Sequence, residues 1–99
     1  MQHYMVECTL PEELPAEFVL LIPRQREAVK KMMVKGTISS YTLAEDRSKL
    51  WIVIKSDTKE KAAGFFESLP LAKFMTYSLV ETTVHRIVSH VQVHYLCMN

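Results

Sequence analysis

The order of strand-like and helix-like segments constrains this chain most. Residues 3–10 alternate between two faces, as a strand does, and residues 37–43 and 49–55 read as two further strands joined by the polar stretch "AEDRS". Residues 15–35 and 57–69 instead repeat apolar side chains at helical spacing, and residues 75–85 read as a last strand. The order β-α-β-β-α-β predicts a ferredoxin-like α+β fold, in which two helices cover one face of an antiparallel sheet.

The other face of that sheet is the reason to expect self-association. Apolar residues make up 48% of the 99-residue chain, and an open face carrying Met5 and aromatic side chains would be an unusually apolar patch on a monomer. Two sheets packed face to face would cover it, so we expect a homodimeric α+β barrel formed by residues 1–86. Residues 87–99 read as an extra strand that could pair with a neighbouring protomer.

Charge and composition argue against several protein classes. The net charge is +1 and no basic stripe with interleaved aromatics is present, so we expect no nucleic-acid partner. The longest apolar run, residues 18–22, is too short to span a bilayer, and the first residues do not resemble a signal peptide. We therefore expect a cytoplasmic protein with no membrane partner. Cys8 and Cys97 could form one bridge, but free thiols fit that compartment better.

The segment "SLPLAKFMTYSLVETTVH", residues 68–85, resembles the end of the muconolactone isomerase family. There, a Leu-Pro-Leu segment and an aromatic-Met pair precede the last strand. The first strand, the long helix stopped by Gly36 and the following "TISSYTL" are similar in order and spacing, so the resemblance covers about residues 2–86. It implies assembly through the sheet, no metal or organic cofactor, and an activity that moves a proton within an unsaturated lactone. Pro23 and the ending beyond His85 differ from the family pattern.

The stretch "LLIPRQR" in the first helix indicates a ligand pocket. Pro23 removes the hydrogen bond to the carbonyl of Val19 and bends the helix, which would open space above the sheet. Gln25 and Arg26 would reach into that space, and the Arg26 guanidinium could bind a substrate carboxylate. In the alternative reading, Pro23 begins a second helix and Arg26 extends into solvent.

Glu7 is the candidate catalytic base. It lies in the middle of the expected central strand, on the face away from the helices, where a desolvated carboxylate could accept a proton near neutrality. The alternative role is an interface ion pair with Lys55 or with a basic group of a partner. Glu7 and Arg26 are expected on opposite faces of the sheet, so they could share a pocket only across protomers or around the sheet edge.

Four further residues are candidates for ligand binding: Ser40, Tyr41, Trp51 and Tyr77. Polar-tipped aromatic side chains are typical walls of small-molecule pockets, although aromatics on a sheet also serve in cores and interfaces. Ser40 adds a hydroxyl group, but neither a Ser-His-Asp order nor a glycine-containing elbow supports a hydrolase.

The histidines near the end of the chain do not predict a metal site. In a helix, His90 and His94 would lie one turn apart and could share an ion, with His85 nearby in sequence. The valines of this segment favour a strand, in which four residues separate the two side chains by roughly 13 Å. We therefore expect no bound metal.

These observations give one leading hypothesis. The chain would be a cofactor-independent, isomerase-like enzyme acting on a small unsaturated lactone or related carboxylate. Arg26 and Gln25 would hold the anionic arm, and Glu7 or a pocket hydroxyl would transfer the proton. The alternatives are a non-catalytic small-ligand or partner-binding module on the same barrel, and a cofactor-free monooxygenase.

Overall fold

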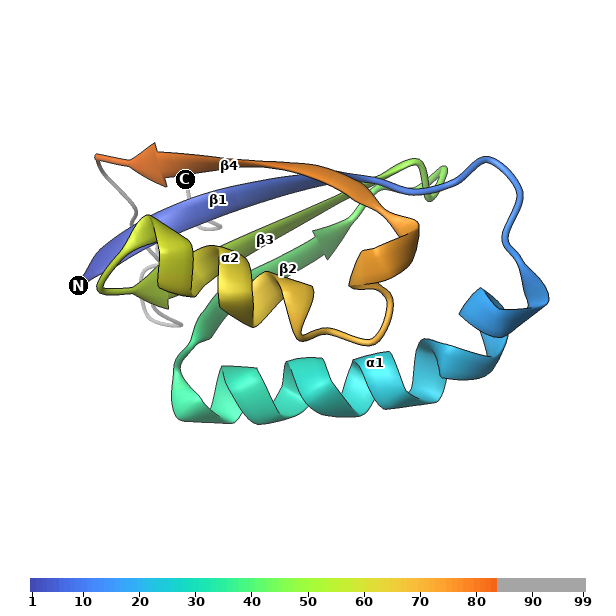
Figure 1. Cartoon of the computed structure of the whole chain (residues 1–99), viewed down its shortest axis with the longest axis horizontal. Coiled ribbons are helices and arrows are strands. Elements are labelled where there is room, and N and C mark those ends of the chain that lie inside the picture. Colours follow the sequence, from blue (N-terminus) through green and yellow to red (C-terminus); the bar gives the residue numbers. More distant parts are fainter. Residues whose placement is uncertain (84–99) are drawn as a thin grey trace, which may run out of the picture.

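The computed structural model describes residues 1–83, and it confirms the predicted order of elements (Figure 1). The extra strand predicted for residues 87–99, together with His85, His90, His94 and Cys97, lies outside the described residues. Within the described part, no helix is long and apolar enough to cross a membrane. The elements are β1 (Gln2–Thr9), α1 (Ala16–Lys35), β2 (Ile38–Leu43), β3 (Lys49–Ser56), α2 (Lys59–Glu67), the short 3-10 helix η1 (Ala72–Phe74) and β4 (Thr76–Thr82).

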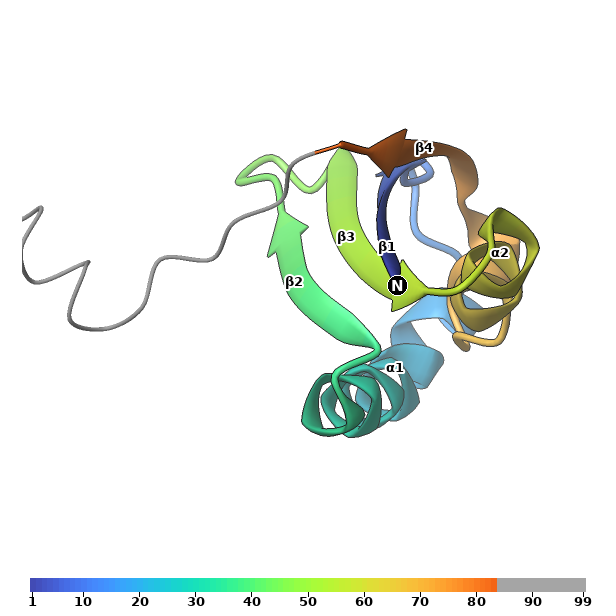
Figure 2. The same cartoon turned by 90° about the vertical axis from the view of Figure 1, so that its left-hand side faces the viewer.

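The four strands form one antiparallel sheet in the order β2-β3-β1-β4. β1 therefore lies in the interior of the sheet, as the topology predicted. Both helices cover the same, concave side of the curved sheet (Figure 2). Among residues 1–83, no helix covers the second face of the sheet, and this is the ferredoxin-like α+β arrangement predicted from the sequence.

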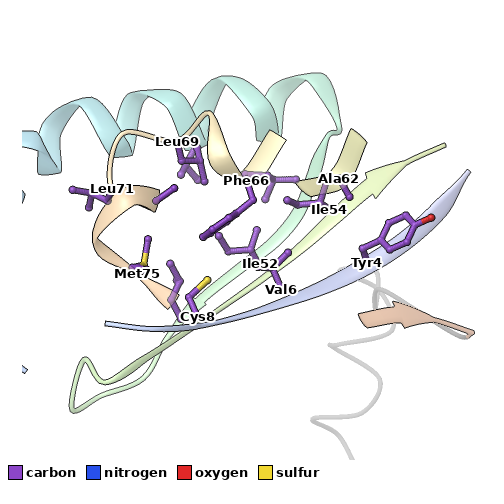
Figure 3. Close-up of a cluster of buried hydrophobic side chains, with 14 of the residues drawn as sticks. Tyr4, Val6, Cys8, Ile52, Ile54, Ala62, Phe66, Leu69, Leu71 and Met75 are labelled. Atoms are coloured by element: carbon purple, nitrogen blue, oxygen red, sulfur yellow. The ribbon is translucent and has the colours of Figure 1, made fainter. Parts of the chain in front are cut away.

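The core lies between this sheet and the two helices. Alternate residues of β1 and β3 point into it, because successive side chains of a strand face opposite sides. Phe66 of α2 is fully buried and points toward the sheet over these residues (Figure 3). Burying one such side chain contributes about 1.5–3 kcal/mol. The buried apolar residues that β1 and β3 contribute to this face are Tyr4, Val6 and Cys8 of β1 and Leu50, Ile52 and Ile54 of β3.

A bulge in β2 decides which of its residues reach the core. Ile38 pairs with Ile54 and Tyr41 with Ile52, so four residues of β2 lie opposite three of β3, and the register shifts between Ile38 and Ser40. An extra residue of this kind turns the following side chains to the other face. Tyr41 therefore faces the helices, while Ser40 shares the open face with its partner Val53.

Helix α1 ends as the sequence predicts and continues through its proline. Gly36 adopts a left-handed conformation, φ 83°, which favours glycine, and its N–H donates to the Met33 carbonyl at 3.0 Å. Pro23 lies inside one continuous helix, so it does not begin a second one. The N-terminal end of α1 is inclined toward the sheet relative to the rest of the helix (Figure 1). Pro23 has no N–H to donate to the Val19 carbonyl, and this missing hydrogen bond accounts for a bend in α1.

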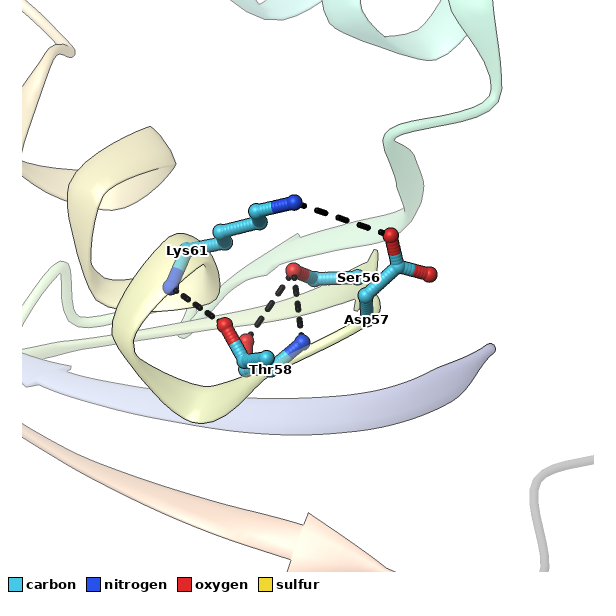
Figure 4. Close-up of polar contacts among 4 residues, drawn as sticks. All are labelled: Ser56, Asp57, Thr58 and Lys61. Atoms are coloured by element: carbon cyan, nitrogen blue, oxygen red, sulfur yellow. Dashed lines mark hydrogen bonds and ion pairs between the residues drawn. The ribbon is translucent and has the colours of Figure 1, made fainter.

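Thr58, and not Asp57, caps the start of α2. Thr58 is the last extended residue before the helix, and its hydroxyl accepts from the Lys61 N–H at 3.1 Å. Asp57 instead forms an exposed ion pair with Lys61 at 3.7 Å (Figure 4). The Ser56 hydroxyl donates to the Thr58 carbonyl at 3.0 Å and fixes the turn before the helix.

Candidate functional site

A pocket of about 250 Å³ lies between the N-terminal half of α1 and the sheet. Its position matches the space expected beneath "LLIPRQR". The volume is below the range of roughly 300–1,000 Å³ that is usual for drug-sized ligands, so the pocket suits a single small ring. Most of its wall is apolar, and this part includes Phe18, Ile22, Leu43, Leu50, Leu71 and Met75.

Gln25 connects three parts of the pocket wall. Its side chain is almost fully buried, with 3% exposed. Its Oε1 accepts a hydrogen bond from the Leu71 backbone N–H at 3.0 Å, and its Nε2 donates to the Tyr41 hydroxyl at 3.3 Å. Because the backbone N–H can only donate, the orientation of the amide is fixed. The Tyr41 oxygen therefore accepts from Gln25 and keeps its own proton free to donate to a ligand.

Tyr41 is suited to donating a proton rather than accepting one. Burial raises the pKa of Tyr41 above its usual value, and the hydrogen bond from Gln25 offsets part of this effect. A phenol with a raised pKa stays protonated near neutrality. Tyr41 can therefore act in this pocket as a hydrogen-bond donor or a general acid.

Two arginines line the same pocket, Arg26 of α1 and Arg47 of the turn between β2 and β3. Both residues are exposed to solvent as well as lining the pocket. Within residues 1–83, neither group takes part in an ion pair or a hydrogen bond through its side chain. The sequence analysis identified Arg26 but missed Arg47. The sequence signal that could have identified Arg47 is its position as a basic residue in the turn of the hairpin formed by residues 37–55.

Glu7 lies on the opposite face of the sheet, away from this pocket. It pairs with Trp51 of β3, and the Trp51 indole N–H donates to its carboxylate at 3.0 Å. Its side chain is exposed, so the desolvation expected for a buried base is not found. Within the described residues it forms no ion pair with Lys55. Glu7 and Arg26 thus lie on opposite faces, as expected.

The other candidates are distributed over both faces. Ser40 and Trp51 share the open face with Glu7. Tyr77 faces α2, where its hydroxyl donates to the Glu67 carboxylate at 2.6 Å. This hydrogen bond is the main reason that the pKa of Tyr77 is raised. Of the seven residues predicted for the site, the structure brings three together in the pocket: Gln25, Arg26 and Tyr41.

Two other kinds of site have no support in the described part of the chain. Residues 1–83 contain no group of three or more His, Cys, Asp or Glu side chains that could hold a metal ion. Cys8 is a free, buried thiol among apolar neighbours. Burial raises the pKa of Cys8 to about 12, with a smaller contribution from Glu7. A thiol with so high a pKa is a poor nucleophile.

Comparison with known proteins supports the fold. No protein-family model and no curated sequence matches the chain. Among solved structures, a 5-chloro-2-hydroxyhydroquinone dehydrochlorinase from Burkholderia phenoliruptrix AC1100, in complex with 2,5-dihydroxybenzoquinone, is similar, with a TM-score of 0.52. The alignment covers 86% of this chain and 95% of that one, at 10% sequence identity. The two chains thus share the α+β arrangement across nearly their whole length.

Proposed function

We propose that this protein binds a small unsaturated carboxylate, or a lactone with a carboxylate arm, in the pocket beneath α1, and that it acts on this ligand by proton transfer without a cofactor. One observation carries the proposal. Arg26, whose side chain has no ion-pair or hydrogen-bond partner among residues 1–83, and a protonated tyrosine, Tyr41, line the same small apolar pocket. Such chemistry requires an anion-binding group, a proton donor and a base, and Arg26 and Tyr41 supply the first two.

Each polar residue has a separate role in this proposal. Arg26 binds the carboxylate through paired N–H donors, which gives both charge and direction. Tyr41 donates its free proton to a carbonyl or ring oxygen of the ligand. Gln25 is a positioning residue. Its hydrogen bond from the Leu71 N–H fixes the amide, and the amide then donates to the Tyr41 oxygen and leaves the phenolic proton free to donate to the ligand. The apolar wall contacts the ring and excludes water.

The structural neighbour supports a ligand of this size. Its structure contains 2,5-dihydroxybenzoquinone, a single oxygen-bearing ring. A ring of this kind, with a carboxylate added, is compatible with a pocket of about 250 Å³.

A non-catalytic binding protein is the second candidate, and one observation favours it. An isomerase must take a proton from carbon before it returns one. The described residues that line the pocket include no carboxylate and no histidine, and Tyr41 is held in its protonated form. In this second candidate, Arg26 and Tyr41 would bind the ligand and release it unchanged.

Two measurements test the proposal and separate the candidates. Replacing Arg26→Met should weaken the binding of benzoate by about tenfold or more in calorimetric titration, since tenfold corresponds to about 1.4 kcal/mol. Arg24→Met is the matched control, because Arg24 lies on the same helix but lines a shallow groove outside the pocket. Equal affinities in wild type and Arg26→Met would refute the binding mode.

Catalysis is tested separately with muconolactone in D₂O. An isomerase should exchange a carbon-bound proton of the ligand for deuterium, which proton NMR detects as the loss of a signal. Tyr41→Phe should slow this exchange while the benzoate affinity changes little. Binding that depends on Arg26, without any deuterium exchange, would favour the non-catalytic candidate.

A further inference from the structure

The turn between β2 and β3 holds Arg47 in a defined place. The Ala44 N–H donates to the Lys49 carbonyl at 2.9 Å, and the Arg47 N–H donates to the Ala44 carbonyl at 2.9 Å. Arg47 itself adopts φ 63°, a left-handed conformation that a residue with a long side chain seldom adopts. The turn is therefore built by its own hydrogen bonds, and Arg47 is one of the residues that line the pocket.

The carboxylate closest in sequence to Arg47 is already engaged. Asp46 Oδ1 accepts from the Ser48 backbone N–H at 3.0 Å and from the Ser48 hydroxyl at 2.6 Å. These hydrogen bonds keep the pKa of Asp46 below its usual value, so it stays ionised in the turn. Within the described residues Asp46 forms no ion pair with Arg47.

The pocket thus carries two positive charges and no negative one among its described lining residues. Arg26 comes from helix α1 and Arg47 from the turn between β2 and β3, so the two charges reach the pocket from different elements. Each guanidinium offers a planar set of donors that matches one carboxylate. A ligand with a single carboxylate would leave one of the two groups without a partner.

From this arrangement we infer that Arg47 is a second anion-binding residue and that the pocket is selective for small ring compounds with two acidic groups, such as a dicarboxylate. The inference rests on the proposed function, since it concerns the same pocket, and it narrows the ligand class. A single ring with two short acidic arms agrees with a volume of about 250 Å³.

The test compares ligands that differ only in the second acidic group. Benzoate, isophthalate and terephthalate are titrated by calorimetry into the wild-type protein and into Arg47→Met, Arg47→Lys and Arg24→Met. We expect at least one dicarboxylate to bind the wild type about tenfold more tightly than benzoate, as one more charge-assisted contact would give. Arg47→Met should remove this preference, so that benzoate and the dicarboxylates bind this variant with equal affinity. Arg47→Lys should retain part of it.

The control and the refuting outcomes are distinct. Arg24→Met removes one positive charge outside the pocket, so it should leave the preference for dicarboxylates intact. Equal affinities for benzoate and both dicarboxylates in the wild type, or a preference that survives in Arg47→Met, would overturn the inference while Arg26-dependent binding stands. If benzoate binding does not depend on Arg26, the proposed function itself fails.

Discussion

The buried amide of Gln25 allows the most direct test of how this pocket is built. Gln25→Leu keeps a side chain of similar size but removes both hydrogen bonds. The Leu71 N–H, which donates to Gln25 at 3.0 Å in a buried setting, would lose its partner. An unsatisfied buried donor costs about 1–3 kcal/mol. The bond to the half-buried Tyr41 hydroxyl is longer, 3.3 Å, and contributes about 0.5 kcal/mol.

We therefore expect Gln25→Leu to lower the free energy of unfolding by about 2 kcal/mol. Urea denaturation measures this change, which should appear as a lower midpoint at an unchanged slope. In a domain of this size, each kcal/mol corresponds to about 4–8 °C in melting temperature, so calorimetry provides a second measurement.

The matched variant is Tyr41→Phe. It removes only the longer hydrogen bond but leaves the buried Gln25 Nε2 donor without that partner, so it should cost about 1 kcal/mol, less than Gln25→Leu. The double variant then reports the coupling between the two side chains, which should be small, because most of the cost arises at Leu71. A Gln25→Leu protein as stable as the wild type would refute the reasoning, since the Leu71 N–H would then have found another partner.

Two further predictions concern residues outside the pocket. Thr58→Ala should destabilise the protein by about 1 kcal/mol, because it removes the cap of α2. Asp57→Ala should cost well under 1 kcal/mol, because the ion pair of Asp57 with Lys61 is exposed. Equal effects of the two substitutions in urea denaturation would contradict the assignment of Thr58 as the cap. The pKa of Cys8 is raised from 9.0 to about 12 in the folded state, so its contribution to stability is complete below pH 9 and is lost as the pH rises toward 12. Cys8→Ala should therefore show a weaker decline of stability over this range, and identical pH profiles would contradict the prediction.

Much of the fold could be predicted from local patterns. Period-two alternation identified β1, and the chain order fixed its interior position in the sheet. Gly36 marked the end of α1, because a left-handed residue closes a helix and glycine adopts that conformation without strain. The helix that carries Gln25 and Arg26 followed from its apolar spacing. Gln25 and Arg26, two and three positions after Pro23, were thus placed in the pocket wall by sequence reasoning alone.

The remaining features depend on contacts between distant segments. The bulge after Ile38 turns Tyr41 toward the helices, and no alternation within residues 37–43 reveals it. The partner of Gln25 is the backbone of Leu71, 46 positions away, so its role could not be read from its neighbours in sequence. Arg47 was missed because its direction depends on a turn conformation. Glu7 was placed on the correct face, but its exposure depends on the neighbouring strands.

The pocket is assembled from segments that are far apart in the chain. Its wall combines residues 10–26, residues 41–50 and residues 71–75, and no single helix or hairpin contains more than part of it. Such a site does not exist in the unfolded chain, so a ligand bound there reports on the whole domain. At a concentration one hundred times its dissociation constant, a ligand would add about 2.7 kcal/mol to the free energy of unfolding. The melting temperature of the intact protein can therefore serve as the readout when candidate compounds are screened.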